Sequence, residues 1–207
     1  MNTIKFLFLI TLITTFNSCS NDDGTDQMEV ESRSVSNLHA PQEGGQGQPV
    51  SGPFTKFDLE TGVETTSQTE WDIAFRGTTI IVNGGASFGA TDEPARNGEA
   101  AVYIASGTLA SVNQVDTTAF EQDSAAGYAI SSGSNNGWYT YAGPPTHLIS
   151  PIAGKILVFR TRSGNFAKME ILSYYENAPE NPDAFVDADG YYTFNFVYQP
   201  NNGEVNF

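Results

Sequence analysis

Short segments in which apolar and polar residues alternate, bounded by glycine, proline or asparagine, are the feature that most limits what this chain can fold into. Residues 54–59 alternate in this way, as a half-buried β-strand does. In residues 166–175, alternate positions form two faces, and the face that carries Ala167, Met169 and Ile171 is predicted to be the more buried. No apolar pattern repeats every 3.6 residues for long, which disfavours a helical bundle.

Eight segments have this strand pattern. They are residues 54–59, 70–75, 78–82, 100–105, 137–141, 155–162, 166–175 and 191–198. The sequence Arg162-Ser163-Gly164-Asn165 lies between two of them and predicts a hairpin turn, since Gly and Asn tolerate positive φ. The fold class predicted is all-β, a single domain of packed antiparallel sheets.

The N-terminus has the pattern of a lipoprotein signal peptide over residues 1–18. Lys5 supplies the positive start, and the apolar run over residues 6–13 is too short for a bilayer core, which needs about 20 residues. The only cysteine, Cys19, follows directly, and Phe16-Asn17-Ser18-Cys19 resembles a relaxed bacterial lipobox. We therefore predict lipidation at Cys19, with a stray thiol after an ordinary export signal as the alternative.

Residues 19–50 are predicted to be a flexible tether that starts at the lipidated cysteine. The segment is rich in Asp, Glu, Ser, Gln and Gly. Its first polar residues, Ser20-Asn21-Asp22-Asp23, resemble the acidic tag of surface-exposed Bacteroidetes lipoproteins. Apolar residues begin to alternate with polar ones near Pro53, so residues 51–207 are assigned to the folded domain. The predicted location is the outer membrane, facing the cell surface, with the lipid as the only membrane contact.

Charge and residue counts exclude several classes of function. Nine Lys and Arg against 24 Asp and Glu give a formal charge of −15, which would repel phosphate backbones, so nucleic acid is not an expected partner. One cysteine excludes an internal disulfide framework and any multi-cysteine zinc or iron–sulfur site. Two histidines leave little material for metal chemistry.

No catalytic residues are predicted, and the chain is expected not to be an enzyme. Serine nucleophiles usually need a histidine base, and of the two histidines His39 falls in the predicted tether. Paired carboxylates could hydrolyse a glycosidic bond, but the 24 acidic residues offer no means of choosing a pair. A carbohydrate-active enzyme stays open only on acidic richness and surface location.

His147 is the ionisable residue of most interest. Pro144 and Pro145 precede it and Pro151 follows it, so the imidazole could be held out as a metal or haem ligand. The alternative is a turn residue that only forms hydrogen bonds. Met169 could supply a thioether to haem iron, but its place on the apolar face of a strand equally predicts core packing.

Several sequence blocks resemble the HmuY-like family of Bacteroidetes lipoproteins. The first is Trp71-Asp72-Ile73-Ala74-Phe75-Arg76, followed by residues 78–85. Others lie at residues 155–161, 164–175 and 190–198, so the resemblance spans nearly the whole domain. It implies an all-β fold and a haemophore, a protein that captures haem at the cell surface and passes it to an outer-membrane TonB-dependent receptor for iron acquisition.

The family's haem ligands are not preserved at their expected positions. One family histidine lies about five residues after the tryptophan that corresponds to Trp138, where this chain has Gly143. The other comes from a longer insertion, which residues 129–137 replace here without His or Met. The candidate cofactor-binding residues are therefore His147, Met169 and Tyr141, with His147 as the candidate metal ligand.

Two functions follow from this reading. The first is binding of haem or a related tetrapyrrole, with Arg76, Arg96 or Lys155 as candidate partners of the propionates. The second is an adhesion or glycan-binding lipoprotein on the same scaffold, favoured by the absent family ligands and by the 12% of aromatic residues.

Overall fold

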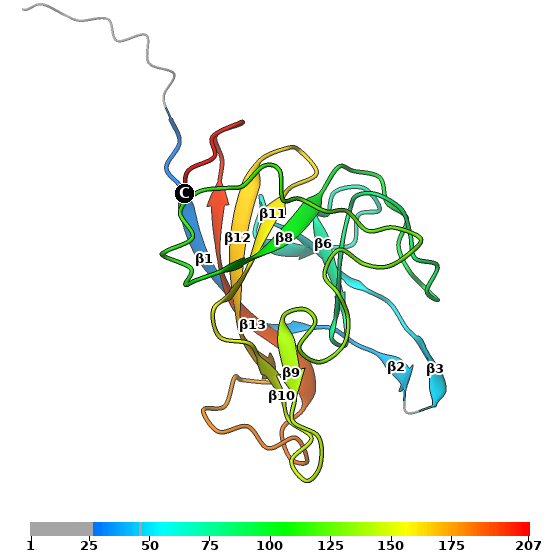
Figure 1. Ribbon diagram of the computed structural model, residues 1–207. Coiled ribbons are helices and arrows are strands. Elements are labelled where there is room, and N and C mark those ends of the chain that lie inside the picture. Colours follow the sequence, from blue (N-terminus) through cyan, green and yellow to red (C-terminus); the bar gives the residue numbers. More distant parts are fainter. Residues whose placement is uncertain (1–26, 46) are drawn as a thin grey trace, which may run out of the picture.

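The computed structural model describes residues 27–45 and 47–207, and within these ranges the chain forms strands, turns and loops without a helix. Every pairing between its named strands is antiparallel. No helix able to cross a membrane occurs in that part of the chain. The all-β fold class predicted from the alternation is confirmed (Figure 1).

The larger sheet has five strands in the spatial order β1-β13-β12-β11-β8. Their bounds are β1 Glu31–His39, β8 Ala101–Ser106, β11 Lys155–Arg160, β12 Phe166–Tyr175 and β13 Asp189–Gln199. The tight turn predicted at residues 162–165 joins β11 to β12, where the Thr161 amide donates to the Asn165 carbonyl at 2.8 Å. Gly164 takes φ 93° in that turn, a conformation that favours glycine.

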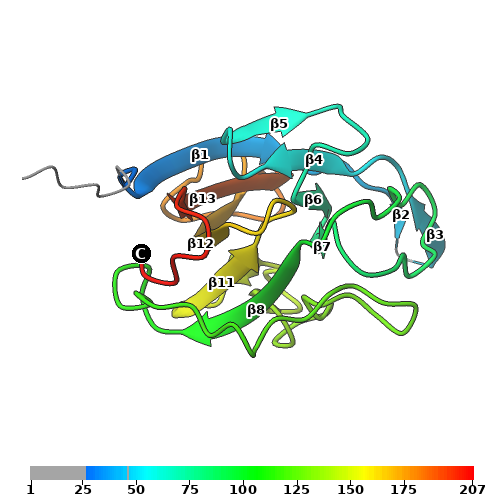
Figure 2. The same cartoon turned by 90° about the horizontal axis from the view of Figure 1, so that it is seen from above.

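The smaller sheet has four strands in the order β5-β4-β6-β7. Their bounds are β4 Thr55–Asp58, β5 Val63–Thr65, β6 Ile73–Arg76 and β7 Thr79–Val82. In Figure 2 the strands of the larger sheet follow one another in a curve from β1 to β8, and β6 and β7 lie on its inner side.

The core lies between the two sheets and is aromatic. Phe57 of β4 meets Phe194 and Phe196 of β13 edge-on, with ring centroids 5.6 and 5.9 Å apart. Met169 belongs to the same cluster and is fully buried. Apolar faces from both sheets thus enclose a single main core, as in other β-sandwiches.

A half-buried guanidinium joins the two sheets at the edge of this core. Arg162, in the β11–β12 turn, pairs with Asp58 and Asp72 at 3.2 Å and with Glu70 at 3.0 Å. Asp72 also accepts hydrogen bonds from the amides of Leu59 and Arg162. Burial raises the pKa of the Asp72 carboxyl above its ordinary value despite these partners.

The prediction of a tether through residue 50 is wrong for residues 31–39. They form β1, which pairs with β13 from Glu31↔Tyr198 to His39↔Tyr191. Leu38 enters the core beside the aromatic cluster, and Ala40 is buried as well. The structured region therefore begins before residue 51. Signal peptide, Cys19 and the tether up to residue 26 lie outside the described residues.

All eight predicted strand segments overlap observed strands, and the face of β12 predicted to be the more buried packs into the main core through Ala167, Met169 and Ile171. One feature departs from simple alternation. The register of β12 against β13 shifts between Ile171 and Ser173 and again between Ser173 and Tyr175. Because of this irregularity, Tyr174 and Tyr175 are both buried although they are neighbours in sequence.

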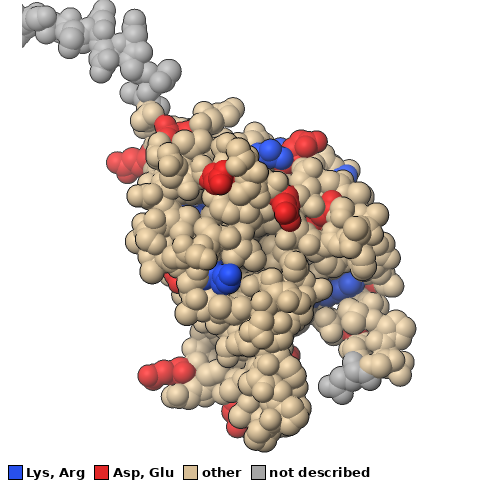
Figure 3. All heavy atoms as spheres, in the orientation of Figure 1, with Lys and Arg blue, Asp and Glu red and all other residues tan. Residues whose placement is uncertain are grey.

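Two hairpins project from the sandwich. One consists of β2 Glu43–Gly45 and β3 Gln48–Ser51, and the other of β9 Tyr139–Tyr141 and β10 Ile149–Pro151. The β9–β10 hairpin lies beside the long loop of residues 176–188, and we call these two segments together the hairpin lobe. Figure 3 shows the hairpin lobe and the β2–β3 arm as separate projections with a gap between them.

Candidate functional site

The β9–β10 hairpin holds the two polar candidates of the predicted site, Tyr141 and His147. Tyr141 pairs with Ile149 across the hairpin. The chain between the strands closes on itself, since the His147 amide donates to the Gly143 carbonyl and the Ala142 amide to the Leu148 carbonyl, each at 2.8 Å. His147 takes φ 55°, in the left-handed region that few residues other than glycine adopt.

The base of the hairpin is fixed to the core. The Trp138 indole donates to the Thr78 carbonyl at 2.9 Å, and its ring packs 5.1 Å from Tyr192. The Ile149 amide donates to the hydroxyl of Tyr175 at 3.0 Å. These contacts place a short and exposed hairpin on a rigid base.

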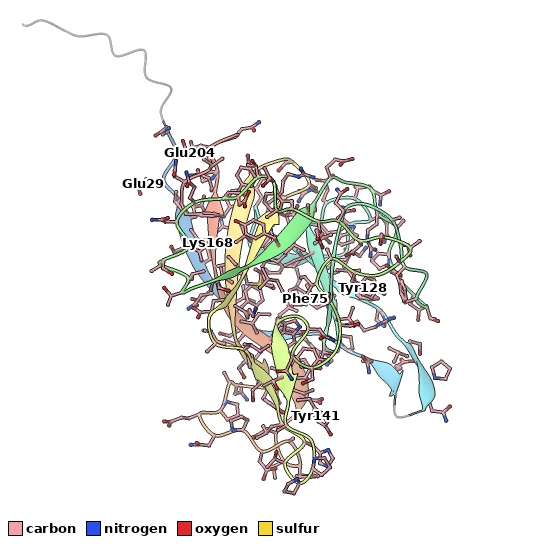
Figure 4. The ribbon with its side chains drawn as sticks, viewed as in Figure 1. Glu29, Phe75, Tyr128, Tyr141, Lys168 and Glu204 are labelled. Carbon is pink, nitrogen blue, oxygen red and sulfur yellow. The ribbon has the colours of Figure 1, made fainter. Side chains whose placement is uncertain are left out.

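Tyr141, His147 and Phe185 form a surface cluster at the tip of the hairpin lobe. The Tyr141 hydroxyl is in hydrogen-bond contact with Nδ1 of His147. The imidazole also meets Phe185 of the 176–188 loop edge-on, with ring centroids 5.7 Å apart. Tyr141 is 43% exposed and Phe185 is 72% exposed. Figure 4 shows Tyr141 in this lobe, away from Tyr128 and Lys168 in the body.

Two open grooves flank this cluster. One has a volume of about 360 Å³ and runs between the hairpin turn and the 176–188 loop; its lining residues are Pro145, Thr146, Leu148, Pro182, Asp183, Ala184 and Phe185. The other has a volume of about 320 Å³; its lining residues are Gln42, Thr78, Ser134, Tyr139, Tyr141, Ile149, Tyr174 and Asp189. Apolar and aromatic side chains make up much of both walls, and the only charged groups are carboxylates.

The structure brings together two of the three predicted ligands and separates the third. Tyr141 and His147 touch, so the two side chains could ligate iron only from the same face of a porphyrin and not from opposite faces. Met169 is fully buried in the core between the sheets and lines neither groove. As a cofactor-binding residue it is a correction to the sequence prediction, because the apolar face of β12 that carries it packs inward.

Two of the basic residues expected to pair with propionates are engaged elsewhere. The buried Arg76 donates to the carbonyls of Gly52 and Thr91, and Arg96 pairs with Glu93 and Asp123. Lys155 lies at the start of β11 and lines neither groove. None of these three basic residues therefore lines either groove of the hairpin lobe.

The Tyr141–His147 cluster can supply one side chain as a ligand to a metal ion. Among residues 27–45 and 47–207, no group of three or more His, Cys, Asp or Glu side chains is arranged to hold a metal ion. A metalloporphyrin needs less, since four ligands come from the macrocycle and the protein supplies one or two. Both a histidine nitrogen and a tyrosine oxygen are known axial ligands of haem iron, so the donors at the cluster suit that group.

A larger groove lies elsewhere and lacks such donors. Its volume is about 610 Å³, and its lining residues are Glu43, Gly52, Pro53, Phe54, Lys56, Gln68, Asp92, Glu93, Pro94 and Ala95. No histidine, tyrosine or methionine is among them. Volume alone would therefore point to a surface with no suitable iron ligand.

Phe185 was missed in the sequence prediction. It stands with Val186 in residues 176–188, a segment otherwise dominated by Asn, Pro, Asp, Glu and Ala. Two large apolar residues in such a segment, which the structure leaves 72% and 79% exposed, are the signal that could have found this side of the site.

The comparisons with known proteins agree with the fold. The family model of the HmuY protein matches residues 52–196. The apo HmuY analog of Tannerella forsythia is 12% identical, covers 85% of this chain and 100% of its own, and has a TM-score of 0.50.

Two structures from Bacteroides are also similar. A candidate lipoprotein of Bacteroides fragilis is 15% identical, covers 84% of this chain and 94% of its own, and has a TM-score of 0.47. A candidate HmuY-like haem-binding protein of Bacteroides vulgatus is 13% identical, covers 85% of this chain and 97% of its own, and has a TM-score of 0.47. No curated protein matches. Since the family model spans well over half of the chain, the protein belongs to the HmuY family.

Proposed function

We propose that this protein binds haem or a related tetrapyrrole at the hairpin lobe and is a non-catalytic carrier of the haemophore type. The observation that carries the proposal is the Tyr141–His147 pair, which places iron-ligating atoms on an exposed hairpin between two open grooves. Membership of the HmuY family supports the same ligand class.

The walls of the grooves suit a flat apolar macrocycle. Phe185 and Leu148 line one groove, and Tyr139 and Ile149 line the other, so a porphyrin face would cover side chains that are now exposed to water. Asp183 and Asp189 are the charged groups that line the grooves. The propionates of a bound haem would therefore point to solvent.

The cellular setting proposed is a lipid anchor at Cys19 in the outer membrane, with the domain at the cell surface. The signal-peptide pattern and the cysteine that follows it support the anchor. A TonB-dependent receptor would be the partner that takes up the iron or haem. Delivery of the ligand to a receptor requires a site that is open to solvent, and the exposure of Tyr141 and Phe185 meets that requirement.

A haemin titration of the purified protein tests the proposal. We expect a shifted Soret band with saturable 1:1 binding, and a loss of affinity of about fivefold or more in Phe185→Ala, because the ring forms one wall of the groove. Phe88→Ala is the matched control, since Phe88 is 50% exposed but lies outside both grooves, and it should bind as the wild type does.

The alternative is a glycan-binding or adhesion module. Exposed aromatic side chains beside carboxylates and amides, as at Tyr141, Gln42 and Asp189, also suit sugar rings. A protein that leaves the haemin spectrum unchanged and binds defined glycans, with loss of that binding in Tyr141→Ala, would favour this alternative and contradict haem binding.

A further inference from the structure

We propose that the iron ligand is the phenol oxygen of Tyr141, with His147 as its hydrogen-bond acceptor, and that the site therefore selects ferric over ferrous porphyrin. This inference rests on the haem-binding function proposed above. It replaces the imidazole, the sequence-based candidate, with the neighbouring side chain that it touches.

The direction of the hydrogen bond decides which of the two side chains, Tyr141 or His147, can ligate the iron. A phenol is a good hydrogen-bond donor and a weak acceptor, whereas the unprotonated nitrogen of a neutral imidazole is a strong acceptor. The favoured arrangement has the Tyr141 hydroxyl donating to Nδ1 of His147. The ring proton of neutral His147 then resides on Nε2, so neither imidazole nitrogen offers a free lone pair to iron, while the phenol oxygen keeps its own lone pairs.

The positions of the neighbouring rings support the same assignment. Phe185 packs edge-on against His147 and covers part of the imidazole. Tyr141 lines the groove that also contains Tyr139 and Ile149, so its side chain borders an open space of about 320 Å³. The closed turn at residues 143–147 and the strand pairing of Tyr141 with Ile149 fix the two side chains relative to each other.

The ligation step balances as a proton transfer without any redox change. The oxygen–iron bond forms as the phenol O–H bond breaks, the proton passes to Nδ1 of His147, and the water held by ferric haemin leaves. The acceptor at Nδ1 assists this step in the way that outer hydrogen-bond partners increase ligand basicity at metal sites.

Charge makes such a ligand selective for the oxidation state. A ferric porphyrin core carries one positive charge that attracts the tyrosinate directly, whereas a ferrous core is neutral and gives the phenolate no opposing charge at the iron. With the transferred proton on His147, the ferric site keeps a net positive charge and the ferrous site has none. The carboxylates of Asp183 and Asp189, on a protein with formal charge −15, therefore stabilise the ferric site more. An anionic oxygen is also a harder ligand than imidazole, and it favours the harder ferric ion.

The test compares Tyr141→Phe, His147→Gln and the wild type with ferric haemin, dithionite-reduced haem, gallium(III) protoporphyrin and metal-free protoporphyrin. The chain offers a matched control, because its other histidine, His39, stacks on Tyr191 with ring centroids 4.4 Å apart. Tyr191→Phe therefore alters a surface tyrosine beside a histidine without touching the hairpin lobe. Circular dichroism checks that each variant is folded.

We expect the wild type to bind ferric haemin and gallium(III) protoporphyrin at least tenfold more tightly than reduced haem. The ferric haemin complex should show the resonance Raman signature of an iron–tyrosinate bond. Tyr141→Phe should lose that signature and at least tenfold in ferric affinity. His147→Gln should keep the signature with weaker binding, and Tyr191→Phe should match the wild type.

Three results would overturn the inference, and they differ in what else they overturn. If Tyr141→Phe keeps full affinity while His147→Gln loses it, the imidazole is the ligand and haem binding stands. If metal-free protoporphyrin binds as well as haemin in every variant, the macrocycle is held without an iron ligand and tetrapyrrole binding stands. If the wild type binds no porphyrin at all, the proposed function fails together with the inference.

Discussion

Tyr192 shows how a single side chain connects the sandwich to the hairpin lobe. Its hydroxyl donates to the Gly77 carbonyl at 2.9 Å, in the turn between β6 and β7. Its ring packs against Phe75 and Trp138 at centroid distances of 4.9 and 5.1 Å. The side chain is fully buried, and burial raises the pKa of its phenol well above the ordinary value.

The buried phenol predicts a loss of stability in alkali. Unfolded tyrosine ionises near pH 10 while folded Tyr192 keeps its proton, so above pH 10 the unfolded state binds fewer protons and the free energy of unfolding falls. Between pH 10 and 11 this one group should remove about 1 kcal/mol. Denaturant unfolding of wild type and Tyr192→Phe at both pH values measures the difference.

The Tyr192→Phe variant separates the effect of Tyr192 from that of other groups that titrate near pH 10. Burial lowers the pKa of Lys56 and Lys168, which changes stability in the opposite direction as the pH rises toward 10.5. Tyr192→Phe should be less stable at pH 8, because it loses the bond to Gly77, but should lose less additional stability between pH 10 and 11. Equal losses in the two proteins would contradict the assignment.

Among the elements, β1 marks the limit of what alternation can predict. The strands with strong apolar content, such as β11 and β12, follow from the sequence because their side chains alternate between core and a second surface. β1 reads Glu-Ser-Arg-Ser-Val-Ser-Asn-Leu-His, and as an edge strand it buries little besides Leu38. Its pairing partner β13 lies about 150 residues later, so local composition carries no sign of it.

A core substitution in β1 tests whether this element belongs to the domain. Leu38→Ala should lower the free energy of unfolding by about 2–5 kcal/mol, because it leaves a cavity beside the aromatic core. Val50→Ala, in the exposed β2–β3 arm, is the matched control and should change stability by less than about 0.5 kcal/mol. Urea unfolding of both variants measures the effect. An unchanged free energy of unfolding in Leu38→Ala would indicate that residues 31–39 are a tether and not part of the domain.

The hairpin lobe was partly predictable for a different reason. The prolines around His147 and the strand pattern over residues 137–141 pointed to this segment from the sequence alone. The contact of His147 with Tyr141 depends on the hairpin register, and its contact with Phe185 depends on a loop from a distant part of the chain. The same dependence explains Met169, whose apolar face was recognised but whose enclosure required the second sheet.

At the scale of the molecule, a closed sandwich carries an exposed aromatic cluster on one lobe. Three of the large apolar side chains that remain exposed, Tyr141, Phe185 and Val186, belong to this lobe. Binding residues commonly occupy loops that a rigid scaffold positions, and here Trp138 and Tyr175 provide the rigid base. On the face seen in Figure 3, basic side chains are isolated from one another, which agrees with a small ligand rather than a polyanion.

The central claim is that haem occupies the grooves of the hairpin lobe, and hydrogen–deuterium exchange of the protein with and without one equivalent of haemin tests it most directly. Bound haem should slow amide exchange in residues 139–151 and 176–188, while β2–β3 and the groove around Phe54 and Lys56 exchange as before. Unchanged exchange throughout, or protection confined to the Phe54 and Lys56 groove, would contradict the account.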